Sequence, residues 1–78
     1  MKSTLDRLPV GASAKIEEVS TVSDRAGRMA ALGFIPGSVV KVTRHAPLGD
    51  PISVELDGQE ISLRRAEAAI IHIEEIAK

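Results

Sequence analysis

Frequent glycines and prolines restrict the folds that this chain can adopt more than any other feature of its sequence. Six glycines and four prolines are spread over 78 residues, and both residue types interrupt helices and central strands. The elements between them must be short, which disfavours a bundle of long helices. Leucine, isoleucine, valine and phenylalanine still number 22 residues, enough for one small hydrophobic core. We therefore expect residues 1–78 to form a single domain.

Between the turn residues, apolar and polar side chains mostly alternate, which is the pattern of a half-buried β-strand. We expect strands at residues 13–19, 38–44, 52–57, 60–64 and 69–74. Asp57-Gly58 predicts a two-residue hairpin, because a type I′ turn needs positive φ at both central residues. Leu56 and Ile61 flank this turn and are expected to face the core.

One segment has the spacing of a helix instead. Ala26 and Met29 lie three residues apart in an apolar stripe, and Ser23 is the candidate N-cap. Gly33 stands where helices often end in a left-handed residue, and Pro36 prevents the helix from continuing. This pattern predicts one short helix between the first two strands.

Two helical turns complete the predicted pattern. Leu5 and Leu8 indicate one turn that ends before Pro9, and residues 65–68 form another before the last strand. Residues 1–4 are expected to be frayed. The predicted fold is mainly β: a small SH3-like β-barrel of about five strands, with the short helix inserted after the first strand.

The composition excludes several kinds of chemistry. There is no cysteine, which excludes disulfides, thiolate metal sites and cysteine nucleophiles. Ten basic and eleven acidic residues give a net charge of −1, and Phe34 is the single aromatic residue, so a nucleic-acid surface is not expected. The chain has no phosphate-binding loop and no Gly-x-Ser-x-Gly motif. Without these motifs we expect a protein that is not an enzyme. With no membrane-spanning run and no signal peptide, we expect it to be cytoplasmic.

Metal ligands are also few. His45 and His72 are the two histidines, and the carboxylates are scattered, whereas a metal site needs converging ligands. His72 should face outward, and His45 could meet Asp50 across the base of a loop. We expect no metal site and no cofactor. Three arginines could form a basic edge, although solvated strand faces balanced by glutamates are the favoured interpretation: Arg44, Arg64 and Arg65.

Residues 45–51 are the most unusual stretch. Pro47 and Pro51 bracket a Leu-Gly-Asp tip between two strands, so the loop should be stiff. It is either a wide hairpin turn, with Leu48 packed as a plug, or an ordered recognition loop that presents Leu48 to a partner.

The turn at residues 33–37 has similar punctuation, and alternation does not assign Phe34 to the core. We expect this turn to adjoin the proline-bracketed loop and to form a partner-binding surface with it. The predicted contact residues are Gly33, Phe34, Ile35, Pro36, Pro47, Leu48, Gly49, Asp50 and Pro51.

Three segments appear in a familiar order. They are Leu-Gly-Phe-Ile-Pro-Gly-Ser-Val-Val at residues 32–40, Ala-Pro-Leu-Gly-Asp-Pro-Ile at 46–52 and Ile-Ser-Leu-Arg-Arg-Ala-Glu-Ala at 61–68. Their order and spacing over the whole chain resemble the ferrous-iron transport protein A (FeoA) family.

The resemblance implies an SH3-like barrel in the bacterial cytoplasm. It also implies a partner, the cytosolic part of the membrane ferrous-iron permease, ferrous-iron transport protein B. The expected function is that of a non-enzymatic accessory protein that acts by contact with this permease. The alternative is a small metal-sensing or nucleic-acid-binding barrel, related to the carboxy-terminal domain of metal-dependent repressors. The oligomeric state is left open.

Overall fold

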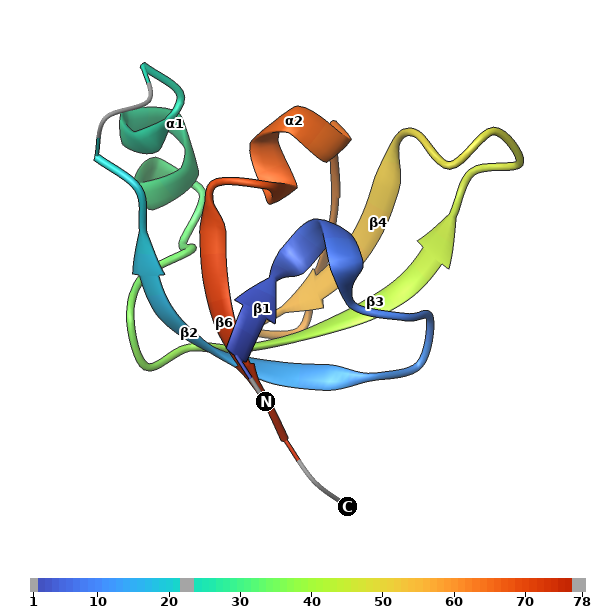
Figure 1. Ribbon diagram of the computed structural model, residues 1–78, viewed down its shortest axis with the longest axis horizontal. Helices are drawn as coiled ribbons and strands as arrows, with labels where there is room; N and C mark the ends of the chain where they lie inside the picture. The colour runs from blue at the N-terminus through green and yellow to red at the C-terminus, as the bar shows by residue number, and fades with distance from the viewer. Residues whose placement is uncertain (1, 22–23, 77–78) are drawn as a thin grey trace.

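The computed structural model describes residues 2–21 and 24–76. In this part of the chain it contains six strands, two short α-helices and one 3-10 turn (Figure 1). Their order is β1 (Lys2–Thr4), η1 (Leu5–Arg7), β2 (Ser13–Val19), α1 (Ala26–Ala31), β3 (Val39–His45), β4 (Ile52–Leu56), β5 (Gln59–Leu63), α2 (Arg65–Ala68) and β6 (Ile71–Glu75).

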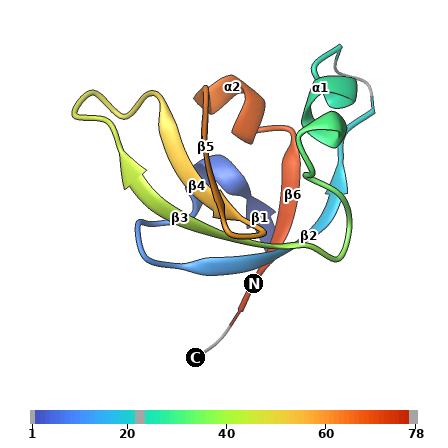
Figure 2. The ribbon, with the colours of Figure 1, turned by 180° about the vertical axis from the view of Figure 1, so that it is seen from behind.

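All six strands belong to one antiparallel sheet in the order β1-β6-β2-β3-β4-β5. The sheet curves strongly around the core, as both ribbon views show (Figures 1 and 2). It does not close into a barrel, because β1 and β5 remain its two edges. The predicted barrel is therefore corrected to an open, curved sheet, whereas the prediction of a mainly β fold with short helical insertions is confirmed.

The open side of the sheet is covered by η1 and α2. β1 ends at Thr4, where the chain turns into η1, and β1 does not pair with β5 in the described sheet. A guanidinium nitrogen of Arg65 in α2 donates a hydrogen bond to the carbonyl oxygen of Asp6 in η1, at 3.0 Å. Short helical segments thus bridge the gap that a ladder of backbone hydrogen bonds would close in a barrel.

The N-terminal prediction needs correction. Residues 2–4 are not frayed: they form β1 and pair with β6, with Lys2 opposite Glu74. The described part of the chain therefore has six strands instead of about five, and α1 follows the second of them. The hairpin prediction is confirmed, because Asp57 and Gly58 have φ of 52° and 79°. The predicted N-cap, Ser23, lies outside the described residues.

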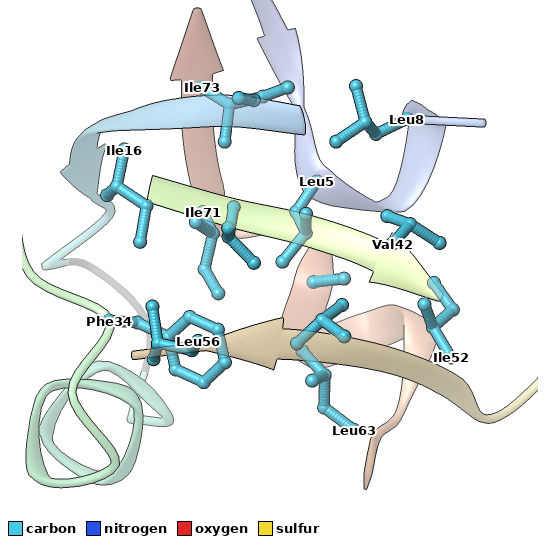
Figure 3. Packing of buried hydrophobic residues seen from close by; sticks show 14 of the residues in the cluster. Leu5, Leu8, Ile16, Phe34, Val42, Ile52, Leu56, Leu63, Ile71 and Ile73 are labelled. Atoms are coloured by element: carbon cyan, nitrogen blue, oxygen red, sulfur yellow. The ribbon is translucent and has the colours of Figure 1, made fainter. Parts of the chain in front are cut away.

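The core fills the concave face of the sheet (Figure 3). Alternation places side chains from β2, β3, β4 and β6 in it, and η1 adds Leu5. Leu56 is buried, as predicted, but Ile61 on the edge strand β5 is only partly buried and packs against the core from its border. Among the described residues, fifteen hydrophobic side chains are buried: Leu5, Leu8, Ala14, Ile16, Met29, Phe34, Val40, Val42, Ile52, Val54, Leu56, Leu63, Ala68, Ile71 and Ile73.

Candidate partner-binding surface

The loop between β3 and β4 projects from the body of the molecule (Figure 1). We call residues 46–51 the Leu48 loop, because the side chain of Leu48 at its tip is 96% exposed. The interpretation of Leu48 as a packed plug is therefore wrong. A large apolar side chain that stands in water is available for a contact with another molecule.

Backbone hydrogen bonds hold the Leu48 loop in one shape. The amide of Gly49 donates to the carbonyl of Ala46 at 2.7 Å, and the amide of Ala46 donates to the carbonyl of Pro51 at 3.1 Å. Gly49 has φ of 86°, a conformation that favours glycine. The Asp50–Pro51 peptide bond is cis. Leu48 is thus carried by an ordered turn, as the two prolines in the sequence indicate.

Asp50 attaches this loop to α2. Its carboxylate accepts a hydrogen bond from the backbone amide of Arg65 at 3.1 Å, and its second oxygen lies 3.9 Å from a guanidinium nitrogen of Arg64. Asp50 therefore positions the loop. No hydrogen bond between His45 and Asp50 is found, and the Nε2 atom of His45 is buried without a hydrogen-bond partner in the described part of the chain.

The turn at residues 33–37 exposes different side chains from those predicted. Phe34 is completely buried, so its prediction as a direct contact is wrong. Exposed apolar residues flank it in the sequence: Leu32 is 37% exposed, and Ile35 and Val39 are each 50% exposed. We call Leu32, Ile35, Pro36 and Val39 the α1–β3 patch. The sequence prediction included Ile35 and Pro36 but missed Leu32 and Val39.

The patch and the Leu48 loop do not adjoin. The turn precedes Val39 and the loop follows His45, so the two segments lie at opposite ends of the seven-residue strand β3. A strand of that length spans about 20 Å, and Figure 1 shows the loop and α1 on opposite sides of α2. Apart from the buried Phe34, the predicted contact residues therefore belong to two separate surfaces.

A polar cleft lies near the Leu48 loop, and the sequence prediction missed it as a feature. It is lined by Arg28, Pro51, Ser62, Leu63, Arg64 and Glu67. At 5% exposure, Glu67 is the one buried charged residue in the described chain. One carboxylate oxygen accepts a hydrogen bond from the backbone amide of Arg64 at 2.9 Å, and the other accepts one from the guanidinium of Arg28. The position of Glu67, three residues after the residue that precedes α2, is a capping signal that could have indicated this contact.

The three arginines that could have formed a basic edge lie on different elements. Arg64 and Arg65 lie at the start of α2, beside Asp50. Arg44 is exposed on β3, where it pairs with Ser53 of β4. No group of three or more histidine, cysteine, aspartate or glutamate side chains converges among residues 2–21 and 24–76. In the same residues, no helix has the length and apolar character required to cross a bilayer.

Comparison with known proteins gives a consistent result. A family model for the FeoA domain matches residues 3–75. A curated protein of Porphyromonas gingivalis, described as a fusion of Fe(2+) transport protein A and the Fe(2+) transporter FeoB, is 34% identical over 73 residues. The match covers 94% of this chain but only 9% of that protein.

Solved structures show the same fold. A FeoA-like protein from Clostridium acetobutylicum superimposes with a TM-score of 0.93 at 26% identity, over 99% of this chain and 90% of the other. A zinc complex of FeoA from Stenotrophomonas maltophilia, described as an SH3 domain protein, has a TM-score of 0.79 at 31% identity, over 91% and 88%. A manganese-dependent transcriptional repressor matches at a TM-score of 0.88 and 19% identity over 37% of its length, a likeness of fold alone.

Proposed function

The chain belongs to the FeoA domain family, and from this membership we propose that it is a non-enzymatic accessory protein of bacterial Fe(II) uptake. It acts in the cytoplasm by contact with the cytosolic part of a membrane Fe(II) transporter. The observation that carries the proposal is the fusion protein, in which a domain 34% identical to this chain is joined covalently to the transporter FeoB. Covalent linkage raises the effective concentration of two partners, so such fusions are consistent with a direct association.

The Leu48 loop is the favoured contact. A leucine that is 96% exposed contributes about 1.5–3 kcal/mol when a partner buries it. The hydrogen bonds within the loop order it before binding, so little conformational entropy is lost in the complex. Gly49 and the flanking prolines set its backbone, and Asp50 fixes it to α2. The exposed part of the turn, Ile35 and Pro36, is a second contact at the other end of β3.

The alternative of a metal sensor has weaker support. The repressor structure matches at 19% identity, and such a match supports a similar fold but not a similar function. The zinc complex is a structure of the S. maltophilia protein, and it assigns no zinc site to this chain. In the described part of this chain the histidines lie on different strands, β3 and β6, and no three metal-binding side chains converge. The residues do not fit a metal centre, and we assign the chain no step that needs one.

Uptake in cells tests the proposed function. A strain that lacks this chain should take up radioactive Fe(II) more slowly under iron limitation without oxygen, and the wild-type chain should restore uptake. Normal uptake in the deletion strain would contradict an accessory role. Calorimetry with Fe(II) and Zn(II) tests the metal-sensing alternative, because a metal sensor must bind its metal ion stoichiometrically.

A further inference from the structure

We propose that the cleft lined by Arg28, Pro51, Ser62, Leu63, Arg64 and Glu67 binds one carboxylate of the transport partner. We call it the carboxylate cleft. The inference rests on the proposed function, because the ligand is an acidic side chain of the protein that the Leu48 loop contacts. The carboxylate cleft thus adds a charged contact to the apolar contact made by the Leu48 loop.

Two guanidinium groups supply the hydrogen-bond donors. The side chains of Arg28 and Arg64 are 61% and 70% exposed. Each guanidinium has five N–H groups, and Arg28 uses one terminal nitrogen for Glu67. Arg64 lies 3.9 Å from Asp50, which is beyond hydrogen-bond range. Both arginines therefore keep donors for an incoming carboxylate, which arginine binds with two parallel hydrogen bonds.

Glu67 makes the cleft specific for one negative charge. Its two carboxylate oxygens accept hydrogen bonds from the amide of Arg64 and the guanidinium of Arg28, so it holds Arg28 at the wall. The six lining residues carry two positive charges and one negative charge. Asp50 and Arg65 at the rim add one charge of each sign, so the net charge stays at +1. A carboxylate matches that charge, whereas a phosphate group with about two negative charges does not.

The cleft is continuous with the Leu48 loop. Pro51 is the last residue of that loop and also lines the cleft. In Figure 2 the loop, α2 and α1 follow one another along one side of the molecule. A partner segment that covers Leu48 with an apolar side chain can therefore place a neighbouring aspartate or glutamate between Arg28 and Arg64. This arrangement commits the cleft to an acidic side chain of a protein.

The test compares two arginine substitutions that change the net charge equally. Arg64→Gln removes a cleft donor but keeps the backbone amide that Glu67 needs. We expect it to weaken binding of the purified cytosolic part of the transporter about tenfold, as loss of a charged hydrogen bond does, with an unchanged melting temperature. Arg44→Gln removes an exposed arginine outside the cleft and should bind like the wild type.

A second variant and a second probe make the result decisive. Ser62→Glu places a carboxylate in the cleft from exposed β5 and should also weaken binding about tenfold. NMR signals of the Arg28 and Arg64 side chains should shift with a glutamate-containing peptide and not with inorganic phosphate. Wild-type binding by Arg64→Gln, equal losses in both arginine variants, or a stronger response to phosphate would overturn the carboxylate cleft and leave the proposed function intact. No binding by the wild-type chain would overturn both.

Discussion

Gly33 controls where the single phenylalanine of the chain lies. Its φ of 104° lets α1 end in a Schellman motif, in which the amide of Phe34 donates to the carbonyl of Met29 and the amide of Gly33 donates to the carbonyl of Ala30, both at 3.0 Å. This motif turns Phe34 into the core beside Leu56 (Figure 3). The sequence predicted the glycine cap but not its effect on Phe34, because strand alternation carries no information about the residue after a cap.

A pair of glycine substitutions tests this description. Gly33→Ala should lower the free energy of unfolding by about 1–3 kcal/mol, because a left-handed residue with a side chain is strained and the new Cβ would lie 3.3 Å from Leu56. Gly27→Ala within α1 meets nothing within 4 Å and should raise it by roughly 0.5–1 kcal/mol. Urea unfolding measures both values, and the opposite order would contradict the assignment of Gly33 as the cap.

For single elements, the spacing of apolar residues in the sequence predicted the type and the approximate bounds. The strand at residues 13–19 and the helical turn at residues 65–68 have the predicted bounds, and the other predicted strands differ by one or two residues. β1 was missed because three residues are too few to show alternation. The open edge of the sheet was missed because closure depends on where β1 ends relative to β5, which no local pattern encodes.

The contact between α1 and α2 is a second property that the sequence does not show, since Arg28 and Glu67 are 39 residues apart. Met29 is the one buried residue of α1, so few core contacts fix this helix. We therefore expect the ion pair between Arg28 and Glu67 to help hold α1 beside α2. Arg28→Gln should lower the free energy of unfolding by about 1–3 kcal/mol, because Glu67 stays buried with one charged partner fewer. Amide exchange at residues 26–31 should accelerate more than in β3.

Arg44→Gln is the control for this prediction as well, because Arg44 has the same charge but lies on an exposed strand position. Equal exchange rates in α1 of the wild type and Arg28→Gln would show that core packing of Met29 alone holds the helix.

At the scale of the whole molecule, the structure separates two surfaces that the sequence prediction joined. Both the Leu48 loop and the turn at residues 33–37 were identified from their glycines and prolines. Their separation depends on the length and direction of β3, which lies between them, and on the position of α2 (Figure 1). The carboxylate cleft likewise combines residues of α1, β5 and α2 with Pro51. The local sequence therefore predicted candidate segments, and the fold decides which of them can act together.

We propose above that this chain contacts an Fe(II) transporter through the Leu48 loop, and one binding measurement tests this contact directly. Binding of the transporter's cytosolic part should be measured for the wild type, Leu48→Ser and Val10→Ser, a control at an apolar residue that is 54% exposed outside the loop. We predict about tenfold weaker binding for Leu48→Ser, from the loss of a buried leucine, with unchanged melting temperatures and wild-type binding for Val10→Ser. Wild-type affinity in a folded Leu48→Ser variant would contradict a contact through the Leu48 loop.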